Sequence, residues 1–330
     1  MKAVMFSKHE FERVSIELAN KVFGHDITFV APQLTAESVG LAKSFPAVIA
    51  STNDKLDAAA LKILKAGGAE LIALRCKGFN NIDLAAAKKL GLRVVRVPSY
   101  SPYSVAEHVF ALLLALIRHI PASVNRNRNE NFTIEGLAGF ELHGKTFAII
   151  GAGQIGLAAA AIAQGFGCEV IAYDTDPAKQ TPGIAYLTLD EVIRRADIIS
   201  LHAPLTAETR HMIGAAQIAR MKRGTIIVNT ARGALIDTVA LIAALKSGQL
   251  GGACLDVYEL EASTFDHDLS GEVLTDDVLA RLLTLNNVLI TSHMGFLTRE
   301  ALKDIAETTL SSLAAFDRHD ALVNEIPAQH

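Results

Sequence analysis

Residues 146–156 read TFAIIGAGQIG, in which an apolar run leads into three glycines at the spacing G-x-G-x-x-G. The glycine pattern alone is weak, but here a predicted strand precedes it and an Ala-rich predicted helix, 154–165, follows it. In chain order, such glycines permit a tight turn, the close approach of a pyrophosphate to the backbone, and close packing of the helix on the sheet. The free N–H groups at the start of the helix would face the phosphates. These glycines are Gly151, Gly153 and Gly156.

Asp174 follows the next predicted strand, 168–173, and lies 18 residues after Gly156 (174 − 156). An acidic residue at this place accepts hydrogen bonds from the adenine ribose of NAD and repels the 2′-phosphate of NADP. The next three residues, Thr-Asp-Pro, include no arginine that would neutralise that phosphate. The pattern therefore favours NAD. The alternative interpretation is a glycine-rich turn in a domain that binds no cofactor, with Asp174 capping a helix.

Short apolar runs alternate with helical patterns on both sides of this motif, which predicts βαβ units and parallel sheets. The expected fold class is therefore α/β, with two doubly wound parallel-sheet domains. The predicted strands before the motif are 3–6, 27–30, 47–50, 71–74 and 94–97, with helices at 57–66 and 81–90. Those after it are 168–173, 198–201, 225–229, 252–257 and 288–291, with a helix near 189–195.

A bend with two prolines at 97–102 separates the two series of strands. The predicted helix that follows, 103–120, is apolar on most sides and must be buried, either in the core or in a subunit interface. The last predicted helix, 298–316, has no strand after it, and the simplest topology returns it to the first domain. We therefore expect a first domain of 1–100 plus 299–330 and an inserted domain of 101–298. The acidic segment 262–277 is expected to be an irregular surface loop.

Composition excludes several classes of protein. The 330 residues suggest two domains, and with half of them hydrophobic and a fifth charged the chain is expected to fold. A net charge of −4 without a Lys/Arg-rich run argues against nucleic-acid binding. The longest apolar stretch, 109–117, is too short to span a membrane, and no signal-peptide core is expected. The three cysteines are far apart, which predicts no metal site and favours a reducing cytoplasm.

Three later strands each end near residues that can do chemistry. In parallel α/β sheets, ligands bind at the carboxyl ends of the strands. Arg232 can grip a carboxylate with two parallel hydrogen bonds, the acids at 259 and 261 can stabilise a charged imidazole, and His293 can transfer a proton. Taken singly, each has a plainer interpretation as a surface ion pair or a structural residue. Residues 202–204 also end a strand and are expected to line the cofactor cleft: His202, Ala203 and Pro204.

With these residues in view, the chain resembles the D-isomer-specific 2-hydroxyacid dehydrogenases and, among them, the fermentative D-lactate dehydrogenases of bacteria. The resemblance runs nearly end to end. The segments that carry it are 74–83, 97–102, 105–108, 151–156, 228–233, 256–261 and 293–298.

The resemblance implies NAD-dependent reduction of pyruvate to D-lactate, with a flavodoxin-like substrate domain and an inserted Rossmann NAD-binding domain. It implies a catalytic set of Arg232 for the substrate carboxylate, His293 as the acid/base, and Glu261 rather than Glu259 as its partner. The implied substrate contacts are Lys77, Gly78, Tyr100, Arg232, His293 and Phe296. The implied dinucleotide contacts are the glycines together with Gln154, Ile155, Asp174, His202, Ala203, Pro204, Thr230, Ala231 and Asp256. The family is usually a dimer or tetramer through the helix after Tyr103, so a homo-oligomer is expected.

The chain departs from the lactate branch at two places. That branch usually reads His-Gln-Ala-Phe where this chain has His293-Met294-Gly295-Phe296, and Thr-Ser-Arg-Gly or Thr-Gly-Arg-Gly where Ala231 precedes Arg232 here. The first departure predicts a roomier or less rigid substrate pocket. Two alternatives stay open: an enzyme for another 2-oxo acid, such as a bulkier one, glyoxylate or hydroxypyruvate, and an NAD-sensing binding protein on the same fold. Formate dehydrogenase is disfavoured, because that branch normally pairs Gln with His and Glu261 is present here.

Overall fold

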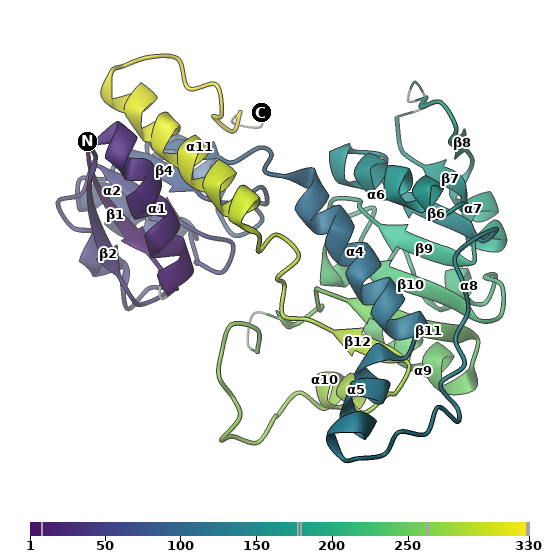
Figure 1. The fold of residues 1–330 in the computed structure, drawn as a ribbon. Coiled ribbons are helices and arrows are strands. Elements are labelled where there is room, and N and C mark those ends of the chain that lie inside the picture. Colours follow the sequence, from purple (N-terminus) through teal and green to yellow (C-terminus); the bar gives the residue numbers. More distant parts are fainter. Residues whose placement is uncertain (8, 177, 179, 262–263, 328–330) are drawn as a thin grey trace. The chain divides into compact units, whose positions relative to one another are not determined.

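The computed structural model describes residues 1–330 except 8, 177, 179, 262–263 and 328–330 (Figure 1). The chain divides into two compact units, one made of Met1–Ser101 with Leu297–His330 and the other of Pro102–Phe296. The predicted inserted domain, 101–298, thus begins one residue earlier and ends two residues later than the second unit. Each unit contains one parallel sheet, as the α/β prediction requires.

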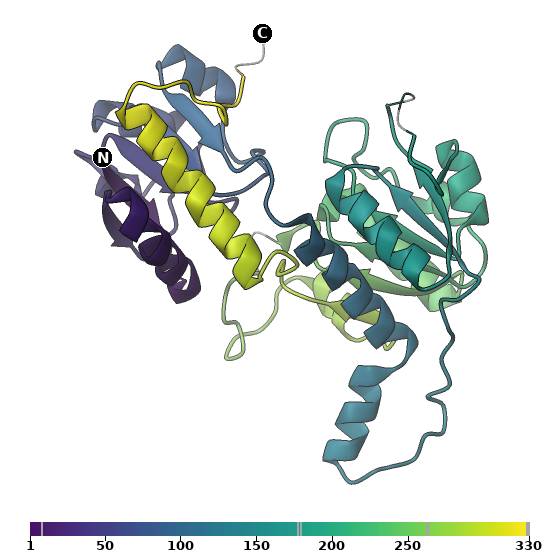
Figure 2. The same cartoon turned by 45° about the horizontal axis from the view of Figure 1, so that its top comes forward.

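The first unit is a five-stranded parallel sheet in the order β2-β1-β3-β4-β5, the flavodoxin-like order. Its strands are β1 (Lys2–Phe6), β2 (Asp26–Val30), β3 (Ala47–Ala50), β4 (Leu71–Leu74) and β5 (Arg93–Arg96). Its helices are α1 (Glu10–Phe23), η1 (Val39–Ala42), α2 (Ala58–Ala66), α3 (Leu84–Lys89) and α11 (Arg299–Asp317). Figures 1 and 2 show α11 beside α1, and the two helices pack together.

The three central strands of this sheet, β1, β3 and β4, are buried on both faces, so their side chains alternate between two cores. In β1, Ala3 and Met5 join the cluster that includes Leu310 of α11, whereas Val4 and Phe6 join the cluster on the opposite face. This explains why the strands read as continuous apolar runs and not as an apolar–polar alternation.

The second unit is a seven-stranded parallel sheet in the order β12-β11-β10-β9-β6-β7-β8. Its strands are β6 (Thr146–Ile150), β7 (Glu169–Tyr173), β8 (Ala185–Tyr186), β9 (Ile198–Leu201), β10 (Thr225–Asn229), β11 (Leu250–Leu255) and β12 (Val288–Ile290). Numbered from β6, the first six strands have the Rossmann order 3-2-1-4-5-6, with the reversal at β6. The predicted fold class is confirmed for both sheets.

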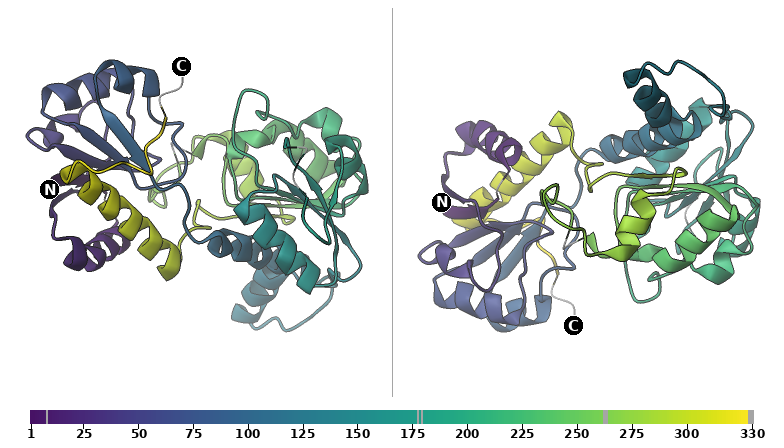
Figure 3. Two further views of the ribbon diagram at one scale, coloured as in Figure 1. Left: turned by 90° about the horizontal axis from the view of Figure 1, so that it is seen from above. Right: turned by 90° about the horizontal axis from the view of Figure 1, so that it is seen from below.

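Helices cover both faces of this second sheet, as the views from above and from below in Figure 3 show. On one face α4 lies beside α6, and a core cluster fills the space beneath them. The helices of the unit are α4 (Pro102–Ile117), α5 (Ile120–Arg128), α6 (Gln154–Gly165), α7 (Leu189–Arg195), α8 (Ala215–Ile218), η2 (Gly233–Leu235), α9 (Thr238–Ser247) and α10 (Asp277–Leu283).

The prediction of a single helix at 103–120 is wrong at its carboxyl end. Helix α4 stops at Ile117, and α5 begins at Ile120 after a bend of 60°. Pro121 lies at the start of α5 and cannot continue the earlier helix, because it has no N–H and its ring would clash with the carbonyl of Ile117. His119 makes the turn with φ of +53°.

Other boundaries differ from the predictions by one or two residues, except that the helix predicted at 81–90 begins three residues later, as α3 (Leu84–Lys89). Strand β11 begins at Leu250 and ends at Leu255, earlier than predicted, and β12 ends at Ile290. The acidic segment is irregular from 264 to 276, and residues 262–263 lie outside the described part of the chain. No single helix among the described residues is long and apolar enough to cross a membrane; only the bent pair α4–α5 meets those criteria jointly, and most of α4 is buried in protein.

Candidate active site

The glycine motif forms the turn between β6 and α6, at the reversal of strand order. Gly151 has φ of +100°, and a β-carbon there would lie 2.7 Å from the backbone carbon of His202. A β-carbon on Gly156 would overlap the carbonyl oxygen of Gly151. Gly153, by contrast, has nothing within 4 Å of its missing β-carbon and caps α6 without a side-chain hydrogen bond. The turn therefore leaves open space at the start of the helix, which fits a pyrophosphate.

Asp174 lies at the end of β7 and is tied to the glycine turn. Its Oδ2 accepts the N–H of Ala152 at 2.7 Å, and its Oδ1 accepts the N–H of Asp176 at 3.0 Å. A carboxylate can accept more than one hydrogen bond on each oxygen, so accepting these amides does not by itself exclude a ribose hydroxyl. The carboxylate therefore holds the turn and presents a negative charge beside it.

The end of β9 packs directly under the glycine turn. The His202 ring lies with its Nε2 2.9 Å from the Ser200 hydroxyl, and burial lowers the pKa of this histidine to about 4. His202 is therefore neutral at pH 7. Ala203 is buried, and the carbonyl of Pro204 accepts the Thr209 hydroxyl at 2.7 Å. Residues 202–204 therefore pack against the glycine turn. These contacts give them a structural role and do not indicate a role in proton transfer.

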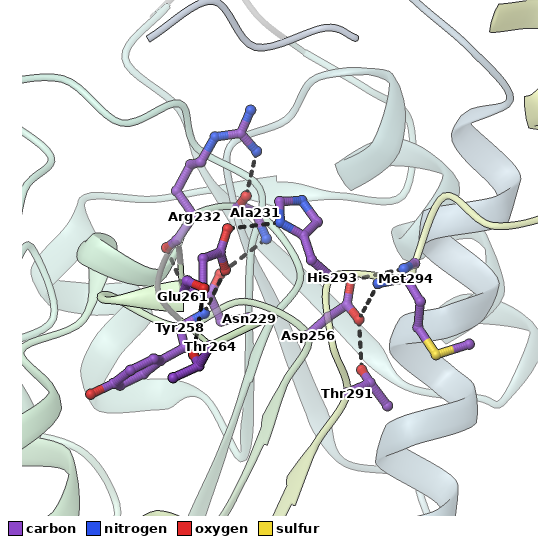
Figure 4. Close-up of polar contacts among 11 residues, drawn as sticks. Asn229, Ala231, Arg232, Asp256, Tyr258, Glu261, Thr264, Thr291, His293 and Met294 are labelled. Atoms are coloured by element: carbon purple, nitrogen blue, oxygen red, sulfur yellow. Dashed lines mark hydrogen bonds and ion pairs between the residues drawn. The ribbon is translucent and has the colours of Figure 1, made fainter. Parts of the chain in front are cut away.

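The turn after β10 carries Arg232 and is pinned by Asn229, which is fully buried. The Asn229 side chain accepts the N–H of Ala231 at 3.0 Å and donates to the carbonyl of Arg232 at 2.9 Å. The guanidinium of Arg232 donates to the carbonyl of Ala231 at 2.6 Å, which leaves most of its five N–H groups for another acceptor (Figure 4). Next to it, the Thr230 hydroxyl is buried with no hydrogen-bond partner among the described residues.

The side chains of Glu261 and His293 meet in a hydrogen bond between the loops that follow β11 and β12 (Figure 4). The His293 Nδ1 lies 2.8 Å from Oε1 of Glu261, and Oε2 of the same carboxylate accepts the N–H of Tyr258 at 2.9 Å. The side chains of His293 and Glu261 are 30% and 23% exposed, so both reach solvent. With Nδ1 donating to the carboxylate, Nε2 is the atom left to exchange a proton.

Asp256 holds the turn that carries His293. Its carbonyl accepts the N–H of His293 at 2.7 Å, its Oδ1 accepts that of Met294 at 2.9 Å, and its Oδ2 accepts that of Gly295 at 2.8 Å. Burial acts to raise the pKa of Asp256, but hydrogen bonds from His108, Thr291 and the two turn amides outweigh it, and the pKa lies below its usual value. Asp256 is therefore a buried anion that fixes the turn.

The other acid of this loop, Glu259, faces a different way. It pairs with Arg210 at 3.0 Å and with His211 at 2.7 Å, in the segment before α8. Gly233 lies against the same loop so closely that a β-carbon would overlap the carbonyl carbon of Tyr258. The loops that carry Arg232 and Glu261 are thus packed against each other through Gly233.

Comparison with known proteins places this arrangement in a family. Residues 110–295 match the model of the D-isomer specific 2-hydroxyacid dehydrogenase NAD-binding domain. The chain belongs to the D-isomer-specific 2-hydroxyacid dehydrogenases. It is 46% identical over 319 residues to 2-hydroxyacid dehydrogenase homolog 1 of Schizosaccharomyces pombe, covering 96% of each chain. It is 41% identical over 327 residues to the aromatic 2-oxoacid reductase of Clostridium sporogenes, covering 98% of this chain and 99% of that protein.

The structure of the D-lactate dehydrogenase from Escherichia coli superposes with a TM-score of 0.89 at 40% identity, covering 99% of this chain and 100% of that one. This dehydrogenase is therefore an NAD-dependent oxidoreductase that interconverts 2-hydroxy and 2-oxo acids. The glycine turn, the buried Thr230 hydroxyl and Asp174 all lie in its NAD-binding domain and fit the dinucleotide.

Three predicted substrate residues of the dehydrogenase lie in the first unit. The carbonyl of Lys77 accepts a hydrogen bond from Arg96 at 2.9 Å, and that of Gly78 accepts the Cys76 thiol at 3.2 Å. Both follow β4, and Tyr100 follows β5, so all three lie past the carboxyl ends of strands. Their contact with substrate stays a prediction, as does that of Phe296 in the second unit.

Sequence reasoning missed the residues that orient the dehydrogenase's site. His108 and Asn229 lie in segments that carry the resemblance, 105–108 and 228–233, but neither was given a role, and Thr291 lies in no such segment. Each acts on a neighbour through hydrogen bonds. A further signal for Asn229 and Thr291 is a polar side chain at the end of an apolar strand. Nothing in the sequence pairs His108, in α4, with the turn at 293–295.

Proposed function

We propose that the dehydrogenase reduces pyruvate to D-lactate with NADH, and that Arg232, Glu261 and His293 are its catalytic residues. The observation that carries this proposal is the 2.8 Å pair between His293 and Glu261, whose carboxylate is itself held by the Tyr258 amide. Such a pair stabilises an imidazolium that can give up one proton in a defined direction.

The roles of the residues follow from their hydrogen bonds. The guanidinium of Arg232 would leave the Ala231 carbonyl and bind the substrate carboxylate with two parallel hydrogen bonds, which orients the 2-oxo group. His293 would then donate the Nε2 proton to the 2-oxo oxygen as that oxygen becomes a hydroxyl. Glu261 would stabilise the imidazolium before transfer and hold the ring in place afterwards. NADH, when bound, supplies the hydride.

The residues proposed to hold NADH line the turn between β6 and α6 and the strand ends beside it. The open side of Gly153 and the start of α6, with Gln154 and Ile155, would receive the pyrophosphate. Asp174 would accept the adenine ribose hydroxyls, and its charge favours NADH over NADPH. The strand ends at 202–204 and 230–231 would line the nicotinamide side, with Asp256 fixing the turn beside it.

The identity of the 2-oxo acid depends on the segment after His293. Gly295 adds no side chain, but the space that a side chain would fill is already taken by Asp256 and His108. The proposal of a roomier pocket therefore rests on Met294, which is 42% exposed and stands where the lactate branch usually has glutamine, and on a relative at 41% identity that is an aromatic 2-oxoacid reductase. The second candidate is therefore reduction of a bulkier 2-oxo acid by the same residues.

A panel of pyruvate, 2-oxobutyrate and phenylpyruvate, each with NADH and NADPH, tests the proposal. We expect turnover of pyruvate with NADH and a measurable rate with the bulkier acids; a steep preference for pyruvate would contradict the roomier pocket. His293→Ala should lower kcat by about a thousandfold and leave NADH binding unchanged. Binding of NADH without turnover of any 2-oxo acid would favour a sensing protein instead. A homo-oligomeric state and a cytoplasmic location stay predictions.

A further inference from the structure

His108 lies in α4, and its ring reaches the residue that holds the turn after β12. The His108 Nε2 is 3.2 Å from Oδ1 of Asp256 and 3.1 Å from Oγ1 of Thr291. The His108 side chain is 16% exposed and that of Asp256 only 2%, so the contact is largely shielded from water. The site described above does not otherwise use α4.

The hydrogen-bond network fixes which atom carries the proton. The Thr291 hydroxyl donates to Oδ1 of Asp256 at 2.6 Å, because a carboxylate there can only accept. The lone pairs of the hydroxyl and the carboxylate therefore both face Nε2 of His108, which must carry a hydrogen. His108 can donate this hydrogen bond to Asp256 both as the neutral imidazole protonated on Nε2 and as the imidazolium.

The network ends at a strained residue. His293 has φ of +54°, a left-handed conformation that non-glycine residues rarely adopt. Asp256 holds it there by accepting the amides of His293, Met294 and Gly295. A carboxylate free to rotate about its side-chain torsions would lose the two amides that it binds with Oδ1 and Oδ2. Among the side chains that the structure describes, those of Thr291 and His108 hydrogen-bond to this carboxylate and restrict its rotation.

We infer that His108 is a positioning residue for His293, acting through Asp256 and the 293–295 turn. The inference rests on the proposed function, in which His293 is the acid/base. His108 touches neither substrate nor cofactor in this scheme. It keeps Asp256 in the one orientation that places the imidazole of His293 against Glu261.

Packing at Gly295 supports the same relationship. A β-carbon on this glycine would lie 3.0 Å from Oδ2 of Asp256 and 3.3 Å from Cδ2 of His108. Both distances are tighter than ordinary van der Waals contact. The turn, the carboxylate and the imidazole therefore form one closely packed group, in which displacement of His108 is felt at the turn.

Steady-state kinetics of His108→Ala test the inference. Misplacement of a catalytic group acts on the chemical step. We therefore expect kcat to fall by about tenfold to a hundredfold, while the KM for NADH stays within about twofold of the native value. His108→Gln, whose amide nitrogen can replace Nε2 as a donor, should recover kcat to within about threefold of the native enzyme. His319→Asn is the matched control: His319 is exposed after α11, and asparagine tolerates its positive φ of 59°.

Each outcome decides the matter. If His108→Ala turns over like His319→Asn, or if His108→Gln is as slow as His108→Ala, the inference is overturned. Should His108→Ala fail to fold, Thr291→Val is the second variant, and it should show the same loss in kcat with an unchanged KM for NADH. Failure of the proposed function has a different signature: either the native protein turns over no 2-oxo acid, or His293→Ala retains turnover, whatever His108→Ala does.

Discussion

His293 and Glu261 are joined by a single 2.8 Å contact from Nδ1 to Oε1, and the second oxygen of Glu261 is already bound by a backbone amide. The carboxylate therefore cannot swing away without breaking two interactions. This fixes the tautomer and the direction of the imidazole, which leaves Nε2 as the proton donor. Glu261 thus both orients the His293 ring and supplies a negative charge beside it.

Glu261→Gln separates these two contributions, because glutamine keeps the size of the side chain and removes its charge. We expect kcat for 2-oxo acid reduction to fall by about tenfold to a hundredfold, since the imidazolium loses its counter-charge. Glu259→Gln is the matched control: it lies in the same loop, but its carboxylate is bound by Arg210 and His211. Loss of turnover in Glu259→Gln alone, with Glu261→Gln unaffected, would show that the wrong acid has been assigned.

Arg232→Lys tests the carboxylate anchor. A lysine ammonium is a point charge and cannot reproduce two parallel hydrogen bonds, so the KM for the 2-oxo acid should rise by about tenfold or more. Arg223→Lys, on an exposed arginine that donates to the Ser247 carbonyl, should leave the kinetics unchanged. Kinetics of Arg232→Lys that match those of Arg223→Lys would remove Arg232 from the substrate site.

Asp256→Asn should lower the free energy of unfolding at pH 7 by about 2 kcal/mol, because an amide NH₂ would face a backbone N–H that now has an acceptor. The pKa of Asp256 is lowered in the folded protein, so its stabilisation is present above the unfolded pKa of aspartate, near 4, and is lost as the pH falls further. Denaturant titrations at pH 7 and at pH 3.5 measure both effects. The difference between native enzyme and variant should shrink at the lower pH; an unchanged difference would contradict the role given to this anion.

The sequence was most informative where one residue type is required by local geometry. The strands are apolar because both faces of each sheet are covered, and the glycines of the β6–α6 turn are required because a β-carbon at two of them would meet backbone atoms. Glu261 and His293 each follow a strand, and parallel strands bring their carboxyl ends to one edge. Both the fold class and the candidate site could therefore be predicted.

The residues that orient the site could not be predicted, for a physical reason. His108 lies 148 residues before Asp256 (256 − 108) and acts only through a contact that the packing of α4 on the sheet creates. Helix α4 was also predicted three residues too long, because the continuous apolar pattern hid the break that Pro121 imposes. Contacts of this kind depend on tertiary structure and leave no periodicity in the chain.

Gly295→Ala tests how closely the turn is packed, and the lactate branch that the chain resembles usually has alanine here. The added methyl group would press on Asp256 at 3.0 Å and on His108 at 3.3 Å, so the variant should lose about 1 kcal/mol of unfolding free energy and several-fold in kcat. Gly271→Ala is the control, because no atom lies within 4 Å of the position that its methyl group would take.

Combining Gly295→Ala with His108→Ala makes the test specific. If the methyl group acts by displacing the imidazole, its effect on kcat should shrink once the imidazole is gone, and the two changes should be non-additive by more than about 0.5 kcal/mol. Strict additivity would mean that the methyl group acts on Asp256 alone. In that case the turn would depend on the Asp256 carboxylate but not on α4, the helix that carries His108. This result would contradict the coupling of α4 to His293.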